Sequence, residues 1–571
     1  MRIKHFFGLA VIAAMTASCS SNNELVNGGN GSGENETGVG YATLSINLPT
    51  TNGTRAGEPA FNPGDAKEYD VKDVTLLIFK EAGSSEGEYT FVETADLGTM
   101  APWVKDNDDN GITTAATITA KLDKVDLTSK YYALVILNNK DKDNKLKVKM
   151  PSADQEYSKW NVATNAKNLV DNTNGFYMAN APKFTAGTEP TTLVKIDQIY
   201  ATKQAAETNK ATTIHVERGM AKVTVAPFPK AQSPTGTKYK SDKVEITAWD
   251  LDVTNKSTFP IHKTAGLTSP FTTIWSASPD PAPSTGRFVD GANTAFKRVY
   301  WGVDPNYNKD LTTVADCEGD FTLLAANADI TGNAATPQYC LENTFDIKHM
   351  LQGQTTRVVF KAKYTPNGFT AGETFYKIGN NTDLWSKTKL EEQIKAKAQE
   401  VLSETDADKV TVKLDATEND IAGTAGTKIL KEENILHDGV KVSTTEINSI
   451  NEKLGLKAAT ETDPIVGIAT YASGESYYIA RIKHFGNDLT PWNEGDLTYG
   501  DNDATQNNKY LGRYGVLRNN WYELTVQSVS GPGTPDVPTI KPDVPDDESY
   551  RYISVSVKIL DWAKRSQNVD L

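Results

Sequence analysis

The chain has 571 residues, a formal net charge of −14 and a mean hydropathy of −0.47. This length is too great for one ordinary hydrophobic core, so we expect two or more domains. The acidic balance and the lack of a Lys/Arg block argue against a nucleic-acid partner. No apolar run is long enough to cross a membrane, so we expect the mature chain to span no bilayer.

The first residues have the pattern of a bacterial export signal. Arg2 and Lys4 precede an apolar stretch, Phe6 to Ala17, that is too short for a transmembrane helix. The stretch ends at Cys19 in a sequence similar to a lipobox, in which the cysteine is lipidated and becomes the first mature residue. The Ser/Asn/Gly-rich run that follows, as far as Gly40, fits a disordered tether. The alternative is an ordinary signal peptide cleaved near Ala17.

Short runs with strand patterns dominate from Tyr41 onward. Asn, Asp, Gly and Pro separate them, which predicts β-sandwiches and not βαβ units. The expected strands are Tyr41–Leu48, Val71–Phe79, Tyr89–Thr94, Ala115–Leu122, Tyr131–Leu137, Met220–Val225, Lys243–Val253, Arg298–Trp301, Thr355–Lys363, Glu373–Ile378, Tyr477–Ile482 and Trp521–Val529. A Pro-rich break at Pro227–Thr237 predicts a domain boundary.

Two helices are expected in a long insertion of the second domain. Residues Lys389–Leu402 place Leu390, Ile394, Val401 and Leu402 on one stripe. A capping box, Ser443–Glu446, opens the second helix, and Gly455 would end it. We expect the apolar stripes to cover a sheet.

The end of the chain reads as a strand without an evident partner. Within residues 550–571, apolar and polar residues alternate with the period of two that a strand requires. The apolar set is Ile553, Val555, Val557 and Ile559, and Leu560 and Trp562 break the alternation. The preceding Pro-rich segment, 531–549, favours an extended spacer that carries the strand to another copy. The alternative is a return onto an edge of its own second domain.

Two cysteines, Cys317 and Cys340, remain after Cys19. In an oxidising compartment they could form one disulfide, with a loop-closure effect of about 3 kcal/mol. They could equally remain two buried thiols. The sequence leaves both alternatives open, because it does not fix the distance between their Cα atoms.

The ordered motifs of the chain resemble those of the type V pilins, the fimbrial subunits of Bacteroidales. The segments that carry the resemblance are Gly175–Asn180, Val216–Val223, Tyr477–His484, Tyr514–Tyr522 and the terminal Ser554–Leu571. Each is a weak signal alone, and their order along the chain is the specific feature. The nearest likeness is to the stalk subunits of minor fimbria.

This resemblance implies a mainly β fold of two tandem transthyretin-like β-sandwich domains, with a small helical insertion in the second and a C-terminal donor strand. The implied organisation is a lipoprotein signal (1–19), a tether and propeptide strand (20–55), a first domain (56–230), a second domain (231–530) with its insertion at about 385–465, a linker (531–549) and the donor strand (550–571).

The resemblance also implies a route of maturation. The chain would reach the outer membrane as a lipoprotein with palmitate on Cys19, and an arginine-specific protease would cut between Arg55 and Ala56. Small neighbours make this bond accessible, although an ordinary exposed arginine would look the same. The released strand contains Ala42, Leu44, Ile46 and Leu48, which alternate as the terminal strand does.

Donor-strand exchange would then join copies head to tail into a cell-surface fimbrium that supports adhesion, biofilm formation and virulence. The expected partners are other copies of the chain, anchor and tip subunits, the protease, and host or bacterial surface receptors. A tip subunit would not need the donor extension, and an anchor would not shed its lipidated leader, so the stalk role is favoured.

No catalytic or cofactor constellation appears, so we expect no enzyme, no cofactor and no metal. The histidines are scattered, and Asp106–Gly111 begins like a calcium loop but has Thr117 where the bidentate carboxylate is needed. Residues 494–503 form a second acidic loop, read as surface. The competing function is a monomeric surface lipoprotein that binds glycans or host proteins and keeps its terminal strand on its own body.

Overall fold

The fold is seen in a computed structural model. It describes residues 39–49, 64–95, 97, 104–105, 112–126, 128–165, 169–170, 172–184, 190–228, 232–265, 288, 297–324, 330–460, 465–486, 490, 510–546 and 553–560. These residues belong to one compact unit and are mainly β, as the sequence predicts. Among them, no helix is long and apolar enough to span a membrane.

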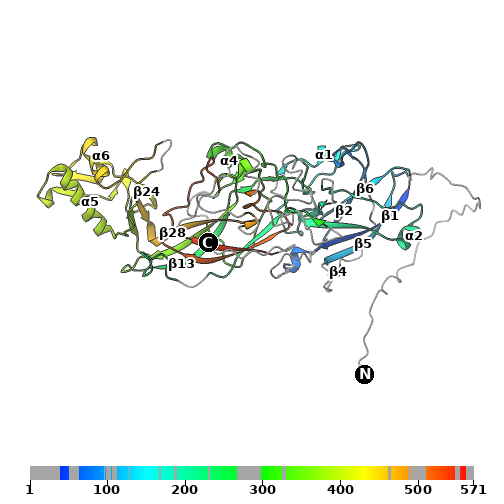
Figure 1. The fold of residues 1–571 in the computed structure, drawn as a ribbon, viewed down its shortest axis with the longest axis horizontal. Coiled ribbons are helices and arrows are strands. Elements are labelled where there is room, and N and C mark those ends of the chain that lie inside the picture. Colours follow the sequence, from blue (N-terminus) through cyan, green and yellow to red (C-terminus); the bar gives the residue numbers. More distant parts are fainter. Residues whose placement is uncertain are drawn as a thin grey trace, which may run out of the picture. The chain divides into compact units, whose positions relative to one another are not determined.

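The first sandwich is built on one folded sheet with the strand order β3-β2-β6-β8-β11-β1-β5-β4, and β10 adds to β6 (Figure 1). Its strands are β1 (Gly40–Pro49), β2 (Val74–Lys80), β3 (Thr90–Thr94), β4 (Val104–Lys105), β5 (Ile112–Leu122), β6 (Tyr131–Leu137), β8 (Met178–Asn180), β10 (Val194–Lys195) and β11 (Thr212–Arg218). The sheet turns at β11, because residues 212–215 pair with β1 while residues 216–218 pair with β8.

The sheet closes around an aliphatic core. Alternate residues of β1 and β5 face alternate residues of β2 and β6, among them Leu44, Ala120, Ile78 and Val135. Helix α1 (Tyr157–Trp160) packs on the opposite face of β2 and β6, where Phe79 meets Tyr157 edge to face. Helix α2 (Lys203–Thr208), capped by Thr202, lies against β1 and β5.

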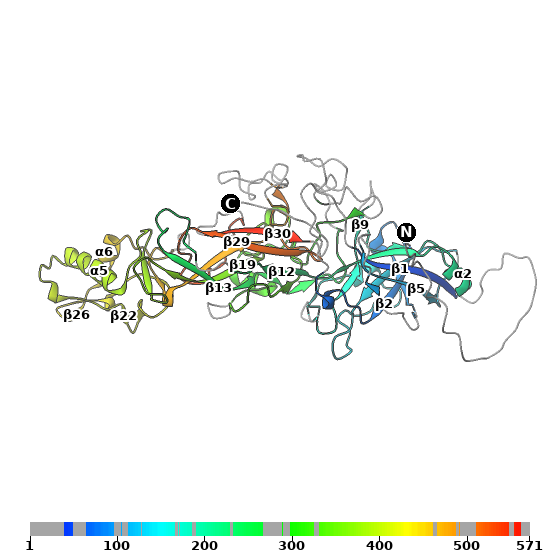
Figure 2. The same cartoon turned by 90° about the horizontal axis from the view of Figure 1, so that it is seen from below.

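The second sandwich consists of two sheets that face each other. One sheet has the order β18-β12-β29-β30 and the other β13-β19-β28 (Figure 2). The strands are β12 (Ala221–Val225), β13 (Lys243–Asp252), β18 (Gln338–Cys340), β19 (Arg357–Thr365), β28 (Glu475–Arg481), β29 (Trp521–Val529) and β30 (Ile553–Leu560). Their inner faces share one buried cluster, which includes Val223, Trp249, Phe360 and Leu524. The expected sandwich architecture is therefore confirmed.

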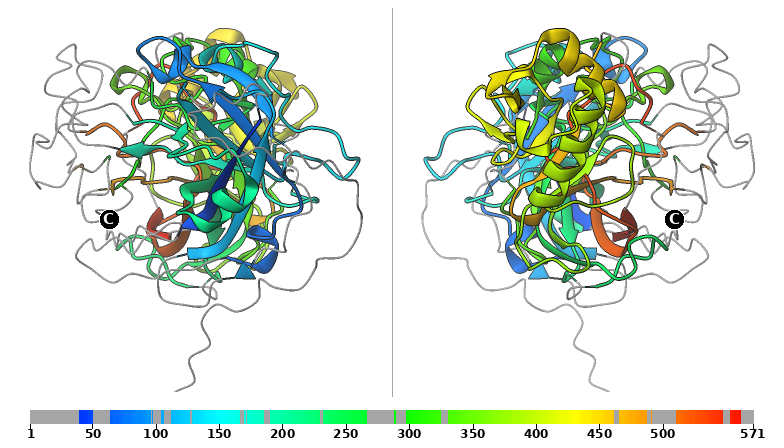
Figure 3. Two further views of the ribbon diagram at one scale, coloured as in Figure 1. Left: turned by 90° about the vertical axis from the view of Figure 1, so that its right-hand side faces the viewer. Right: turned by 90° about the vertical axis from the view of Figure 1, so that its left-hand side faces the viewer.

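The helical insertion forms a lobe between β20 (Phe375–Ile378) and β27 (Ile468–Tyr471). Helices α5 (Lys387–Leu402) and α6 (Thr444–Lys453) contact each other (Figure 3, right). Leu390 and Ile394 of α5 and Ile447 and Ile450 of α6 are buried in one cluster with β20 and β27, so the apolar stripes cover a sheet as predicted. The remaining lobe strands are β21 (Val410–Val412), β22 (Asp415–Ala416), β23 (Asn419–Asp420), β24 (Gly426–Lys428), β25 (Ile435–His437) and β26 (Val440–Lys441).

Both helices begin and end where local chemistry requires. Ser443 and Glu446 cap α6 reciprocally, and Gly455 follows it at φ +70°. Ser386 caps α5, which begins at Lys387, two residues before the start predicted from the sequence. The described residues also include three short strand pairs and a helix: β14 (Thr254–Asn255) with β17 (Phe321–Thr322), β15 (Ser257–Thr258) with β7 (Thr164–Asn165), β16 (Lys297–Arg298) with β9 (Lys183–Phe184), and α4 (Val314–Asp320).

A buried ion pair joins the two sandwiches. The ammonium of Lys222 on β12 lies 2.8 Å from Oε1 of Glu68, and both side chains are at most 4% exposed. The same ammonium sits 3.7 Å from the ring centre of Trp521, whose indole N–H donates to Thr224. Because the pair is closed to water and hydrogen-bonded, breaking it should cost far more than breaking a surface pair.

We expect Glu68→Ala to lower the free energy of unfolding by about 3–5 kcal/mol, because the Lys222 ammonium is left buried without its carboxylate. Urea unfolding monitored by circular dichroism measures the change. The matched control is Glu392→Ala, which removes the partner of exposed Lys389 and should cost less than about 0.5 kcal/mol. Equal effects of the two substitutions would contradict a stabilising role for the buried pair.

Candidate functional site

Strand β1 occupies an interior position of the first sandwich. It runs antiparallel to β5 from Gly40↔Leu122 to Pro49↔Ile112, and parallel to β11 from Leu44↔Thr212 to Asn47↔His215. Tyr41 and Tyr200 exchange two further backbone hydrogen bonds of 2.8 Å. Both backbone edges of β1 are therefore used. We call this place between β5 and β11 the β1 slot (Figure 3, left, with β1 in dark blue).

The side chains of β1 are buried on both faces. Ala42, Leu44, Ile46 and Leu48, which the sequence assigned to a propeptide strand, are each 1% exposed and belong to the first core. On the other face, Thr43 donates its hydroxyl to the carbonyl of Ala206 in α2 at 2.9 Å. With roughly 1.5–3 kcal/mol for each of the three larger aliphatic side chains, β1 contributes on the order of 5–9 kcal/mol of burial.

The connection from β1 to β2 contains the expected processing site. Arg55 and Ala56 lie in this connection but outside the described residues, as does the expected lipidation site Cys19. Between residues 50 and 63, Arg55 is the only Lys or Arg in the sequence. A single cut after it would leave β1 bound to the slot by noncovalent contacts alone.

The terminal strand lies on its own chain. β30 pairs antiparallel with β29 from Trp521↔Leu560 to Val529↔Ile553, with a register shift between Val526 and Ser528. Of the two sequence interpretations, this is the alternative in which the strand returns to its own second domain. The apolar positions Ile553, Val555, Val557, Ile559 and Leu560 all fall within β30, while Trp562 lies outside the described residues. Along the described sheet, β30 is the last strand, so its outer backbone edge has no partner strand.

The described part of the Pro-rich segment is packed on the body of the protein. This part, residues 531–546, which we call the strap, exchanges backbone hydrogen bonds of 2.9 Å between Thr534 and Tyr477 of β28. Further along, Pro538 accepts from Arg357, and Asp546 donates its N–H to Met350. The expectation of a free spacer is therefore wrong for this part of the segment.

The physical reason lies on the outer face of the sheet β13-β19-β28. Val359 and Tyr477 are buried there, although this face points away from the sandwich core. Val537 of the strap packs against this cluster, and Ile540 is 5% exposed in an adjoining one. The strap therefore forms a third layer that removes apolar surface from water.

The two body cysteines do not form the disulfide that the sequence left open. Cys317 on α4 and Cys340 on β18 are both buried, free thiols. They belong to different apolar clusters, the first beside Val253 and Phe321, the second in the core of the second sandwich. Burial raises the pKa of Cys317 to about 11 and that of Cys340 to about 12, which favours the unreactive thiol form.

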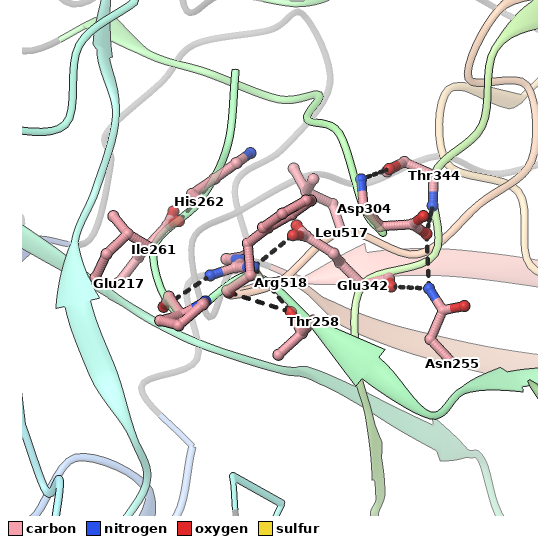
Figure 4. Close-up of polar contacts among 12 residues, drawn as sticks. Glu217, Asn255, Thr258, Ile261, His262, Asp304, Glu342, Thr344, Leu517 and Arg518 are labelled. Carbon is pink, nitrogen blue, oxygen red and sulfur yellow. Dashed lines mark hydrogen bonds and ion pairs between the residues drawn. The ribbon is translucent and has the colours of Figure 1, made fainter. Parts of the chain in front are cut away.

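A buried polar cluster, which the sequence reading missed, fixes the end of β11 (Figure 4). Glu217 on β11 hydrogen-bonds His262 at 2.7 Å, with both side chains at most 4% exposed. Nearby, the Arg518 guanidinium contacts Glu342 at 2.5 Å and donates to Thr258. These residues come from distant segments of the chain and are closed to solvent. The cluster therefore stabilises the end of β11, the strand that borders the β1 slot.

Asp304 extends this cluster toward the second sandwich. Its carboxylate accepts from the side chain of Asn255 at 2.6 Å and from the backbone N–H of Thr344 at 2.8 Å. Burial raises the pKa of Asp304 to about 7, while these N–H donors act in the opposite direction. Asn255 also donates to the carbonyl of Glu342, which connects Asp304 to the Arg518 pair.

The other candidate sites can be placed only in part. Among the described residues, no three His, Cys, Asp or Glu side chains gather to hold a metal. The loop Asp106–Gly111 and residues 494–503 lie outside the described part of the chain. Of the histidines, His262 and His484 are buried in hydrogen bonds, and His349 and His437 contact carboxylates.

The comparisons with known proteins bear on the terminal segment. Residues 469–568 match the family model of the major fimbrial subunit protein type IV, Fimbrillin, C-terminal. This part of the chain is similar to the fimbrillins. The fimbrillin match covers most of β27, all of β28 and β29, the strap and β30, and so includes the pairing of β29 with the terminal strand.

A solved structure gives a weaker likeness. The crystal structure of a fimbrial assembly protein from Parabacteroides distasonis ATCC 8503 aligns with 60% of this chain and 93% of its own, at 14% identity and a TM-score of 0.26. That likeness is too weak to bear on the fold. No curated protein sequence matches the chain.

We expect Ile46→Ala to lower the free energy of unfolding by about 2–5 kcal/mol, because it leaves a cavity in the first core. Ser45→Ala, one residue away and only half-buried, should cost less than about 1 kcal/mol. Trypsin cleavage followed by size-exclusion chromatography and mass spectrometry provides a second readout. The clipped Ile46→Ala chain should release the β1 peptide more readily than the clipped wild-type chain does; equal release would contradict the assigned burial.

Proposed function

We propose that this chain is a structural stalk subunit of a fimbrium and that it polymerises by exchanging strands. Removal of β1 opens the β1 slot, and β30 of a neighbouring copy fills it. The observation that carries the proposal is β1 itself. It is the first described strand, it is joined to the rest through the segment that contains Arg55, and it supplies buried side chains to a core made by later strands.

The terminal strand suits the vacated slot by its pattern. Ile553, Val555, Val557 and Ile559 recur at every second position, as Ala42, Leu44, Ile46 and Leu48 do in β1. Four aliphatic side chains entering the slot would gain on the order of 6–12 kcal/mol before ordering costs. Strand addition of this kind supplies main-chain hydrogen bonds and apolar anchors together.

The exchange must break the pairing of β30 with β29 in its own chain. β29 offers β30 one backbone edge, with eight register pairs. The slot offers two edges, where β1 makes ten register pairs with β5 and four with β11. In the exchange, β30 gives up backbone hydrogen bonds along one edge and gains them along two edges, over a hydrophobic core. This difference favours the filament.

A contact between the donor strand of one copy and the slot of the next produces an assembly that does not close into a ring. The donor strand and the acceptor slot are different surfaces of the chain, so each copy gives one strand and receives another. A head-to-tail contact that does not close on itself builds a filament. Because the donor is also covalently part of its own body, each joint is as strong as the strand's hold on the slot.

The remaining steps of the proposal are supported by the sequence alone. Lipidation at Cys19 would deliver the precursor to the outer membrane, and an arginine-specific protease would cut after Arg55. Anchor and tip subunits would limit the filament at its two ends. The assembled fimbrium would serve adhesion and biofilm formation at the cell surface, a structural role without catalysis.

We expect Arg55→Ala to keep the purified precursor monomeric after limited trypsin treatment, whereas the wild-type chain polymerises. The reason is that an uncut connection keeps β1 in its slot. Size-exclusion chromatography and negative-stain electron microscopy report the outcome. Clean cleavage at Arg55 in the wild type that yields only monomers under polymerising conditions would refute the exchange.

We expect Val557→Asp to abolish filaments after cleavage, because a carboxylate in the apolar slot costs several kcal/mol. Val557→Ile is the matched control, since it keeps an aliphatic side chain at the same position and should still polymerise. Thermal unfolding of both monomers checks that the acceptor body is intact. Filaments formed equally by the two variants would contradict the assignment of the donor face.

The pairing of β30 with β29 also favours a second candidate, a monomeric surface lipoprotein that binds glycans or host proteins. Deletion of residues 553–571 separates the two functions. A stalk subunit without this segment stops polymerising, while a monomeric binder retains its ligand and its oligomeric state.

A further inference from the structure

A pocket of about 430 Å³ lies where the helical lobe leaves the second sandwich. Three segments line it: residues 238–242 before β13, residues 366–369 after β19, and residues 382–389 at the start of α5. This volume falls within the range of small-molecule sites, roughly 300–1,000 Å³. The pocket shares no residue with the β1 slot, β29 or β30.

Fixed contacts hold the walls of the pocket. The Tyr239 hydroxyl donates to the carbonyl of Thr382 at 2.9 Å, which joins the first segment to the third. Asp242 accepts from the Tyr364 hydroxyl at 2.7 Å and from the Asn367 N–H at 2.8 Å, which joins the first segment to the second. The pocket is therefore preformed.

Trp385 and Phe369 form the aromatic wall of the pocket, and each packs against a neighbouring apolar cluster. Trp385 exchanges backbone hydrogen bonds of 2.8 and 2.9 Å with Tyr376, which fixes its place in the chain. Its indole N–H is buried and has no acceptor among the described residues, so no hydrogen bond fixes the plane of the ring. Phe369 supplies a second half-buried ring and stands edge to face with Phe375. Together the two rings offer apolar surface for a flat C–H face.

The polar wall is balanced in charge. The titratable side chains that line the pocket, apart from Tyr239, are Lys238, Lys389, Asp242 and Asp383, two cations and two anions. Lys238 and Asp383 pair at 2.7 Å, so neither presents a net charge to a ligand. The exposed Asn367 amide adds a donor and an acceptor together. A balanced wall disfavours a phosphate or a strongly acidic ligand.

We propose that this pocket binds a neutral saccharide. A sugar ring presents a C–H face to the aromatic rings of Trp385 and Phe369, and its hydroxyls both donate and accept hydrogen bonds at Asn367, Asp242 and the Lys238–Asp383 pair. The proposal does not depend on strand exchange, because it concerns different residues and a monomer carries the complete pocket.

The test uses the full-length monomer on an array of immobilised neutral and acidic oligosaccharides, followed by saturation-transfer NMR titration with the neutral oligosaccharide that gives the strongest signal. We expect Asn367→Ala to weaken binding several-fold and Trp385→Ala to weaken it by about tenfold or more, because the aromatic face is lost. Trp385→Phe should retain part of the affinity. Asn380→Ala is the matched control, an exposed asparagine of the same region outside the pocket, and should bind as the wild type does.

The outcomes decide the proposal in either direction. Thermal unfolding checks each variant, and if Trp385→Ala fails to fold, Asn367→Ala decides, since its exposed side chain makes no hydrogen bond within the described fold. Binding of a neutral oligosaccharide that Asn367→Ala weakens and Asn380→Ala preserves supports the site. Failure to bind any neutral oligosaccharide, selective binding of acidic sugars, or equal binding by the two asparagine variants overturns it.

Discussion

The insertion of β1 between β5 and β11 is the constraint on which the rest of this structure depends. An interior strand forms backbone hydrogen bonds along both edges and buries side chains on both faces. In β1, one face points into the first core and the other is covered by α2. Its loss would expose a row of unpaired N–H and C=O groups together with apolar surface. Such a body must either keep β1 or receive another strand.

The terminal strand, β30, lies at a sheet edge and not in a sheet interior. β30 pairs on one side only and is the last strand along its described sheet. The strap before it is much better held, through Thr534, Pro538 and Asp546, over a face that would otherwise be apolar and exposed. In the proposed exchange, the strap therefore stays on its own body as an anchor, and β30 is the part that moves.

Local pattern was enough to predict much of the fold. Alternation located β1, β5 and β29, a continuous apolar run located β6, and the capping box located α6, because strand faces and helix caps are encoded within a few neighbouring residues. The partners of these strands were not predictable in the same way. β11, which pairs with both β1 and β8, was missed as a strand, although Ile214 and Val216 alternate with His215.

The features that the sequence analysis missed or predicted wrongly all depend on contacts between residues far apart in the chain. Proline favours an extended backbone, but composition does not say whether that backbone lies in water or on Val359 and Tyr477. The buried pairs Glu217–His262 and Arg518–Glu342 likewise unite residues that are 45 and 176 positions apart. No local signal connects such residues; an isolated buried charge is unfavourable, and only the finished fold provides its partner.

Assembly and recognition occupy separate parts of the chain in this view. The β1 slot depends on residues 40–218, and the terminal strand on β29, whereas the pocket is set by residues 238–389. A strand that leaves β29 removes no residue of the pocket wall. Each copy added to a filament would therefore carry its own complete pocket, and the filament would present many weak sites at once. Multivalent attachment of this kind gains strength from effective concentration without requiring a tight single site.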